Sequence, residues 1–334
     1  MEVTLSITTP GPRLGPYNSH NPVSRTQIWQ WCCAMGDTNP LYLDPHYQRG
    51  AGFDVAIAPP AMMQMWTMRD FNHHYAPGST DEPPYGIFAD LDARGYPSNV
   101  AVSYDITFHR YLLEGERPCH YTTIVAVSDA KTTAIGEGVF VTEQVEYTTV
   151  EDRPFATALI TYFQYRPSQP NGTDSQPVRP TDSAVTTLTY EGARSRSASH
   201  RNSNKGNSLP QLVLPVTHQL IVGGAIASQD FVAVHHNAKA ARDAGMADIF
   251  MNILTTCGLL GRYLTDWSGP GARLEALSFK LMAPNHPGDT MVLDGHISAV
   301  DPVTDQTRTH VTLSGANGLG KHVEGTASLL LDSV

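Results

Sequence analysis

The sequence has little of what marks several protein classes. Its 334 residues include only four cysteines, without metal-ligand spacing, so we expect neither a disulfide scaffold nor a zinc module but a reducing, cytoplasmic setting. It has no apolar run long enough to span a membrane, and its first residues do not have the pattern of a signal peptide. The 22 Lys and Arg are outnumbered by 32 Asp and Glu, and the resulting net charge of −10 argues against general nucleic-acid binding.

One long stretch also has few large apolar residues. Residues 166–208 consist mainly of Pro, Ser, Thr, Asn, Gly and Arg, so we expect a disordered linker there. On either side, a helix-rich segment is followed by segments that alternate in hydrophobicity, such as residues 100–108 and 291–300. This repetition predicts an α+β protein with two similar domains, residues 1–165 and 209–334.

A short motif that contains an acid occurs once in each of these domains. In the second domain Asp230 is followed five residues later by His235, an imidazole that could share proton transfer with the carboxylate. In the first domain Asp37 is followed five residues later by Tyr42. The acid and base are therefore both present in only one copy, which predicts one catalytic domain and one domain kept for another purpose.

The spacing between the copies supports a duplication. Asp230 follows Asp37 by 193 positions, and Asn252, at the start of a predicted helix, follows Pro60 by 192 positions. The register then slips, because the first domain carries an additional segment from about residue 72 to residue 98 that is rich in Pro and Gly. This segment could either fold over a pocket or form a plain surface loop.

The residues around these motifs resemble a known family. Residues 36–41, Gly-Asp-Thr-Asn-Pro-Leu, resemble the signature of the MaoC-like, R-specific enoyl-CoA hydratases. Residues 230–237 and 262–267 are similar to the small catalytic subunit of bacterial steroid side-chain enoyl-CoA hydratases, and residues 58–60 and 64–68 to its partner subunit. The resemblance implies a double hot-dog fold, in which each domain has a central helix wrapped by an antiparallel sheet, with both subunits fused in one chain.

The resemblance also implies an activity and a division of labour. It implies a hydro-lyase that adds water reversibly across the α,β double bond of an acyl-CoA thioester with a bulky acyl group of the steroid side-chain type. Asp230 and His235 would hold the water, and which of them takes its proton stays open. The backbone N–H of Asn252 would bind the thioester oxygen, whereas Pro60 has no N–H to offer.

The first domain would then provide room for the acyl group. Met62, Met63 and Trp66 are candidate substrate-binding residues, because flexible thioether and aromatic side chains suit irregular apolar ligands, although a buried core position is the more common role. His73 and His74 have no carboxylate or thiol at ligand spacing, so we expect no metal site. No cofactor is expected, since hydration involves no net redox change.

Several alternatives stay open at this point. The same layout fits a peroxisomal-type hydratase for fatty or branched acyl-CoA, and the hot-dog fold alone would also allow a thioesterase. A non-catalytic protein that binds acyl thioesters is the alternative outside enzymes. Besides acyl-CoA, the partners to consider are a second copy of the chain and a thiolase or aldolase.

Overall fold

A computed structural model describes residues 10–168 and 204–332, and the middle of the predicted linker lies outside these residues. The first half contains helices and strands in the order β1 (Leu14–Asn18), α1 (Arg25–Met35), α2 (Pro40–Leu43), α3 (Pro45–Gly50), the 3₁₀ helix η1 (Pro60–Thr67), α4 (Gly86–Ala93), β2 (Ser98–Phe108), β3 (Pro118–Val127), β4 (Lys131–Thr133), β5 (Gly136–Thr149) and β6 (Ala156–Pro167). The second half continues with β7 (Leu212–Val216), α5 (His218–Ala227), the 3₁₀ helix η3 (Ala233–His235), α6 (Ala238–Asp243), α7 (Ile253–Ser268), β8 (Arg273–Leu281), β9 (Asp289–Val303), β10 (Gln306–Asn317) and β11 (Gly320–Asp332).

The strands form one antiparallel sheet in the order β1-β3-β5-β6-β2-β8-β11-β10-β9-β7, with β4 paired to β5. This order has internal symmetry, because every first-half strand except β4 has a counterpart at the same distance from the centre in the second half. The halves join at the β2 and β8 pair, where Tyr104 lies opposite Phe279 and Ile106 opposite Leu277. The predicted α+β class and the double hot-dog architecture are confirmed. The sequence analysis did not predict β1 and β7, which precede the helices.

The central helix of the second half is α7. Asn252 caps its first turn by accepting a hydrogen bond from the Thr255 N–H at 2.9 Å, and the helix ends at Gly269, whose φ is +85°. A Cβ added at Gly258 would lie 2.8 Å from Trp31 and Met35, and one added at Gly261 would lie 2.9 Å from Ala61. The two glycines therefore allow α7 to pack closely against the first half.

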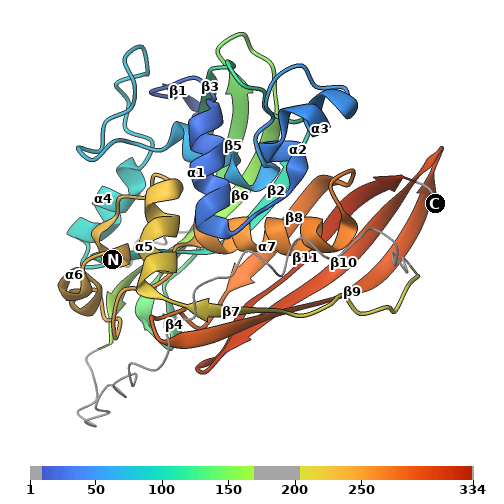
Figure 1. The fold of residues 1–334 in the computed structure, drawn as a ribbon. Coiled ribbons are helices and arrows are strands. Elements are labelled where there is room, and N and C mark those ends of the chain that lie inside the picture. Colours follow the sequence, from blue (N-terminus) through green and yellow to red (C-terminus); the bar gives the residue numbers. More distant parts are fainter. Residues whose placement is uncertain (1–9, 169–203, 333–334) are drawn as a thin grey trace.

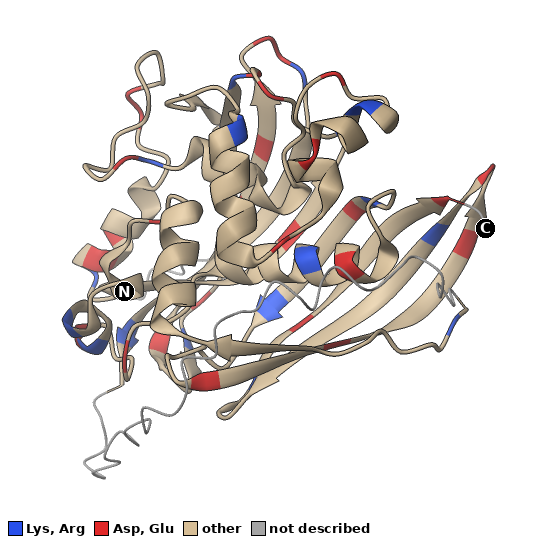
Figure 2. Ribbon diagram, viewed as in Figure 1, with Lys and Arg blue, Asp and Glu red and all other residues tan. Residues whose placement is uncertain are grey.

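Helices α1 and α5 are also equivalent in the two halves. They lie next to each other, as Figure 1 shows in blue and yellow. Each begins at a hydroxyl N-cap, Ser24 for α1 and Thr217 for α5, that accepts a hydrogen bond from the first turn. Figure 2 shows that α5 carries no charged residue, which suits its contacts with α1 and α7.

The central segment of the first half differs from α7. The sequence predicts a second helix carrying Met residues here, and the structure has the short 3₁₀ helix η1, which begins at Pro60 and spans eight residues, whereas α7 spans sixteen. Residues 68–97, which include α4, then connect η1 to β2. As a result, the first half lacks a full-length central helix.

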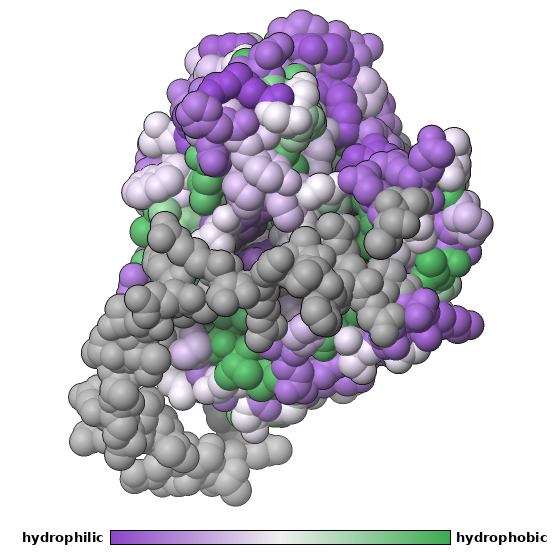
Figure 3. Space-filling view, turned by 45° about the vertical axis from the view of Figure 1, so that its right-hand side comes forward, coloured by the Kyte–Doolittle hydropathy of each residue, from purple (hydrophilic) through white to green (hydrophobic). Residues whose placement is uncertain are grey.

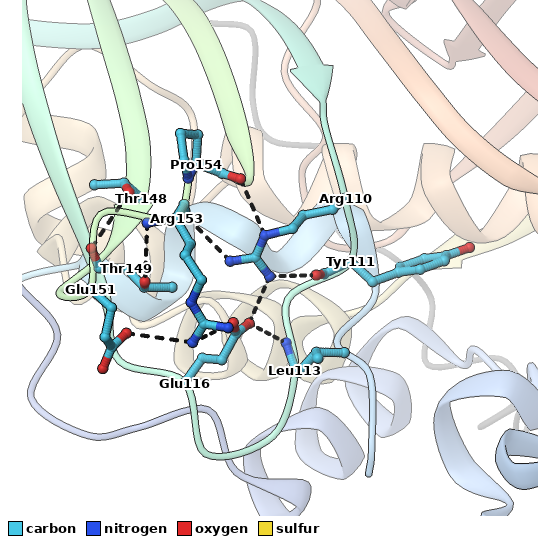
Figure 4. A network of polar contacts seen from close by, with 9 residues as sticks. All are labelled: Arg110, Tyr111, Leu113, Glu116, Thr148, Thr149, Glu151, Arg153 and Pro154. Atoms are coloured by element: carbon cyan, nitrogen blue, oxygen red, sulfur yellow. Dashed lines mark hydrogen bonds and ion pairs between the residues drawn. The ribbon is translucent and has the colours of Figure 1, made fainter. Parts of the chain in front are cut away.

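A polar network fastens the loop between β2 and β3 to the turn between β5 and β6 (Figure 4). The buried carboxylate of Glu116 accepts hydrogen bonds from the Leu113 N–H at 2.7 Å and from Arg110 Nη1 at 2.8 Å, and it pairs with Arg153 Nη2 at 3.0 Å. Arg110 also donates to the carbonyls of Arg153 and Pro154. Because two arginines and a backbone N–H contact this carboxylate, the cluster stabilises the fold.

The described end of the predicted linker runs along the second half of the sheet. The Gly206 N–H donates to the Ile297 carbonyl, and Ser208 forms a bridge with His296 of β9. Within residues 10–168 and 204–332, no helix is long and apolar enough to cross a membrane. On the face seen in Figure 3, apolar side chains outside the grey atoms form only small, separate patches.

Candidate active site

The predicted acid and base lie together in the loop between α5 and α6. Asp230 follows a turn in which Gln229 has a φ of +55°, and its N–H donates to the Ala225 carbonyl. His235 ends the 3₁₀ helix η3. Asp230 Oδ2 lies 3.5 Å from His235 Nε2, and the two residues are only 9% and 7% exposed. The five-residue spacing thus brings the two side chains to one point.

The imidazole of His235 is fixed by the backbone on its far side. Its Nδ1 lies 2.8 Å from the Phe250 carbonyl, which can only accept, so Nδ1 carries the proton. In the neutral ring, Nε2 is then a lone-pair acceptor that faces Asp230. The Phe250 ring also packs edge-on against the imidazole, with the ring centroids 4.9 Å apart.

The side chain of Asn252 has a role that the sequence analysis missed. Its Oδ1 accepts from the Thr255 N–H, so its Nδ2 points the other way and donates to Asp230 Oδ2 and to Ser228 Oγ, each at 2.9 Å. Asn252 is 2% exposed. One amide therefore both caps α7 and positions the Asp230 carboxylate.

The backbone of the same region supplies unpaired donors. Among the described residues, the N–H groups of Asn252, Ile253 and Leu254 find no hydrogen-bond acceptor, as is usual for the first turn of a helix. All three residues line a large cavity. The positive end of the α7 dipole thus faces the same space as the acid and base.

This cavity has a volume of about 810 Å³, within the range of roughly 300–1,000 Å³ that is usual for small-molecule sites. Asp230, His235 and the start of α7 form its second-half side. The first-half side comes from β2, β3, β5 and β6, and on β5 every second residue faces inward, namely Glu143, Val145 and Tyr147. A single site is therefore built from both halves.

The predicted substrate-binding residues Met62, Met63 and Trp66 do not line the cavity. They are at most 3% exposed and lie in the hydrophobic core. In a 3₁₀ helix residues three apart share a side, so η1 presents Gln64 and Thr67 to the cavity and its other two sides to the core. The prediction therefore selected the right segment but the wrong side chains, because it rested on side-chain chemistry and not on the direction in which each side chain points.

The additional segment of the first half folds over the cavity. Its residues Tyr75, Tyr85 and Phe88 line the cavity wall, as does Asp70 just before it. At the edge, Phe71 stacks on Phe231 of the Asp230 loop, with ring centroids 3.9 Å apart and planes at 15°. The sequence left open whether this segment folds over a pocket or forms a plain surface loop, and the structure supports the first alternative.

The first-half copy of the motif is closed. Asp37 accepts a hydrogen bond from the Asn39 N–H, and Asn39 caps α2, so both residues hold a turn. Beside Asp37, Tyr42 and Pro60 there is a void of only about 10 Å³, also lined by α7. Burial raises the pKa of Asp37 to about 6. In the described part of the chain, no imidazole lines the void beside this acid, and the void is too small for a substrate.

Comparison with known proteins agrees with the two-half architecture. Residues 11–158 match the family described as "FAS1-like, dehydratase domain region". The chain is 32% identical over 199 residues, 58% of its length, to the 3-oxo-4,17-pregnadiene-20-carboxyl-CoA hydratase alpha subunit of Mycobacterium tuberculosis, of which it covers 62%. It is 41% identical over 124 residues, 37% of its length, to the beta subunit of the same organism, of which it covers 93%.

The fold has a solved relative. A structure described as a MaoC-like dehydratase superposes with a TM-score of 0.67 at 17% sequence identity, covering 96% of this chain and 98% of that one. The chain spans about three fifths of the length of the curated alpha subunits that it matches. With nearly the whole beta subunit covered at 41% identity, the chain belongs to the MaoC-like hot-dog family of dehydratases and enoyl-CoA hydratase subunits.

Proposed function

We propose that this chain is an enoyl-CoA hydratase, a hydro-lyase that adds water reversibly to the α,β double bond of an acyl-CoA thioester with a bulky acyl group. One observation carries the proposal. Asp230, His235 and the unpaired N–H groups at the start of α7 line the same cavity of about 810 Å³. Hydration needs these three elements together: an acceptor for the proton of water, a proton donor for the α-carbon, and donors for the thioester oxygen.

The geometry of the pair suits a shared water molecule. With its proton on Nδ1, His235 presents a lone pair at Nε2, and the Asp230 carboxylate presents another acceptor 3.5 Å away. A water molecule can donate one hydrogen to each, which leaves its oxygen lone pairs free to attack the β-carbon. The pair takes one proton from the water and returns one to the α-carbon, so the reaction leaves its protonation unchanged.

The start of α7 suits the other end of the reacting system. As the hydroxyl adds to the β-carbon, negative charge develops on the thioester oxygen until the α-carbon is protonated. The N–H groups of Asn252, Ile253 and Leu254 and the helix dipole would stabilise that charge. Asn252 therefore has two proposed roles, as a backbone donor and, through its amide, as the residue that orients Asp230.

The first half suits the acyl group. The short η1 leaves open the space that a second central helix would fill, and the names of the matched alpha and beta subunits refer to a steroid-type acyl-CoA. We extend this substrate class to the present chain. The domain limits 1–165 and 209–334, the linker 166–208 and a cytoplasmic location belong to the same proposal, as does assembly with a second copy or with a thiolase or aldolase.

The test is a panel of unsaturated acyl-CoA esters, from crotonyl-CoA to 3-oxo-4,17-pregnadiene-20-carboxyl-CoA. We expect loss of the enoyl-thioester absorbance and formation of the hydroxyacyl-CoA, fastest with the bulky ester. Release of free CoA would instead indicate a thioesterase, and binding without turnover would indicate a thioester-binding protein. A preference for straight-chain enoyl esters would favour the fatty acyl alternative.

A further inference from the structure

The first-half wall of the cavity is more polar than a pocket for a hydrocarbon requires. Asp70, His73 and Asp92 line the cavity from outside the strands. Between apolar residues such as Val100, Val102 and Val145, the strands of this wall carry one imidazole, one carboxyl group and three phenol hydroxyls, from His120, Glu143, Tyr104, Tyr147 and Tyr162. These residues stand on β2, β3, β5 and β6, whereas the proposed catalytic pair stands on the loop after α5. The hydration mechanism makes no use of them.

His120 is the unusual member of this group. The imidazoles of His235, His286 and His322 also line the cavity, and each is anchored at Nδ1 by a backbone carbonyl. By contrast, neither ring nitrogen of His120 has a hydrogen-bond partner among the described residues, although the residue is only 5% exposed. An unpaired buried polar group costs roughly 1–3 kcal/mol, so a retained one points to a partner that arrives with a ligand.

The surroundings of His120 keep it neutral. Its ring packs beside Tyr17, Tyr75 and Tyr147, with centroids 5.0, 5.7 and 6.0 Å away. Burial lowers the pKa of His120 to about 3, so the ring offers one N–H donor and one lone pair.

Glu143 completes the polar wall. It is 1% exposed, and its two oxygens accept hydrogen bonds from Thr122 Oγ1 and, at 3.2 Å, from the Tyr162 hydroxyl. Among the described residues no Lys or Arg forms an ion pair with it, and burial raises its pKa to about 7. In the part of the chain that the structure describes, the cavity lining on β2, β3, β5 and β6 includes no Lys or Arg, and Arg69, which lines the cavity from outside these strands, lies over the Tyr85 ring. This part of the wall therefore does not suit a carboxylate ligand, whereas an uncharged oxygen can be bound without bringing a second charge next to Glu143.

We propose that His120 binds an uncharged oxygen of the bulky acyl group, a ketone or a hydroxyl, and that the Glu143 and Tyr162 pair continues this polar subsite further along the wall. This rests on the proposed function, because it assigns the acyl group to this end of the cavity. The subsite acts in binding and does not take part in the chemistry. It therefore determines which acyl groups are accepted, since a ligand without the oxygen leaves His120 unpaired.

The first test uses the protein without mutation. The rate of hydration is compared for 3-oxo-4,17-pregnadiene-20-carboxyl-CoA, its 3-hydroxy analogue and its 3-deoxy analogue. We expect kcat/KM to be roughly 5- to 150-fold higher for an oxygen-bearing ester than for the deoxy ester, mainly through KM. Equal values for all three esters would overturn the proposal.

The second test removes the subsite. His120→Phe should abolish most of the preference, and Glu143→Gln should reduce the preference less, because Glu143 lies further along the wall. Tyr17→Phe is the matched control, because Tyr17 touches the His120 ring, donates its hydroxyl to the Glu82 carbonyl and does not line the cavity. A preference unchanged in both subsite variants would contradict the proposal, and the wild-type ratio still tests it if a variant does not fold.

A binding measurement separates this proposal from the proposed function. Calorimetry with the saturated 3-oxo and 3-deoxy acyl-CoA esters, which have no double bond to hydrate, reports the subsite alone. Selective binding of the saturated 3-oxo ester, together with no hydration of any unsaturated ester, would support the subsite and refute the hydratase. Hydration of all esters with no selectivity in binding would support the hydratase and refute the subsite.

Discussion

The two copies of the acid motif lie in equivalent positions but face different spaces. Asp230, with His235 and Asn252, opens into a cavity of about 810 Å³, whereas Asp37, with Tyr42 and Pro60, faces a void of about 10 Å³. The difference does not come from the local loops alone. The acid of each copy faces the central segment of the other half. The length of that segment therefore decides how much space lies beside the acid.

The central segments explain the asymmetry. The second-half acid looks toward η1, which is short, while the first-half acid looks toward α7, which is complete. Arg262 of α7 fills the space beside Asp37 and donates to the Met35 carbonyl at 2.9 Å. The duplicated fold thus combines the proposed reacting groups of one half with an opening in the other. In the remaining copy, Tyr42 stands in place of the imidazole and the void is small.

The strongest test of the comparison replaces, in each copy, the acid and the residue five positions after it. Asp230→Asn and His235→Ala should each lower kcat by about 10²- to 10⁴-fold, because a positioned proton-transfer group is typically worth that much. Asp37→Asn and Tyr42→Phe are the matched changes in the closed copy and should leave the rate of hydration nearly unchanged. Steady-state kinetics decides the matter, and a comparable loss in Tyr42→Phe would remove the division of labour between the halves.

Asp37, in the closed copy of the motif, should affect the free energy of unfolding and not the rate of hydration. Burial raises the pKa of Asp37 to about 6, so between pH 4 and 6 the folded state holds a proton that the unfolded state loses, and stability falls as pH rises through this window. Asp37→Asn removes this term. We expect the stability of the wild type relative to this variant to decrease by up to about 3 kcal/mol over that window, measured by urea unfolding at several pH values. A difference that is constant with pH would contradict the assignment.

The opening can be tested by filling it. Val145 is 3% exposed and faces the cavity from β5, so Val145→Phe should lower kcat/KM for the bulky ester by roughly 10- to 200-fold, with little effect on crotonyl-CoA. Val213→Phe, at an exposed position on β7, is the control for the added ring. Equal losses for large and small esters would mean that the first half does not hold the acyl group.

The smallest expected effect concerns the two asparagine caps. Asn252→Ser keeps an N-cap oxygen for α7 but loses the amide donor to Asp230, so we expect roughly a 10-fold decrease in kcat with a nearly unchanged melting temperature. Asn39→Ser makes the same change at the N-cap of α2, where no acid receives the amide, and should not alter the rate. Should both variants lose activity equally, Asn252 would have no special role.

Much of the candidate site could be predicted from the sequence because it is local. The spacing from Asp230 to His235 fits within one loop, and Asn252 is positioned by the start of its own helix. The contacts of the Phe250 carbonyl with His235 and of the Asn252 amide with Asp230 were missed. The first involves a backbone group, and the second is a hydrogen bond between residues 22 positions apart. Only the N-cap preference of Asn gave a signal for the latter.

The sequence by itself determined the duplication, the α+β class and the asymmetry between the two acid motifs, since these depend on repeated spacing and on residue type. Only the tertiary structure decided which residues line the cavity, because the packing of η1 turns Met62, Met63 and Trp66 toward the core. It also brought His120 and Glu143, 23 residues apart on neighbouring strands, to one wall. The hydrophobic period of a segment shows which of its side chains share one face. What that face contacts is set by packing between segments that are distant in the sequence.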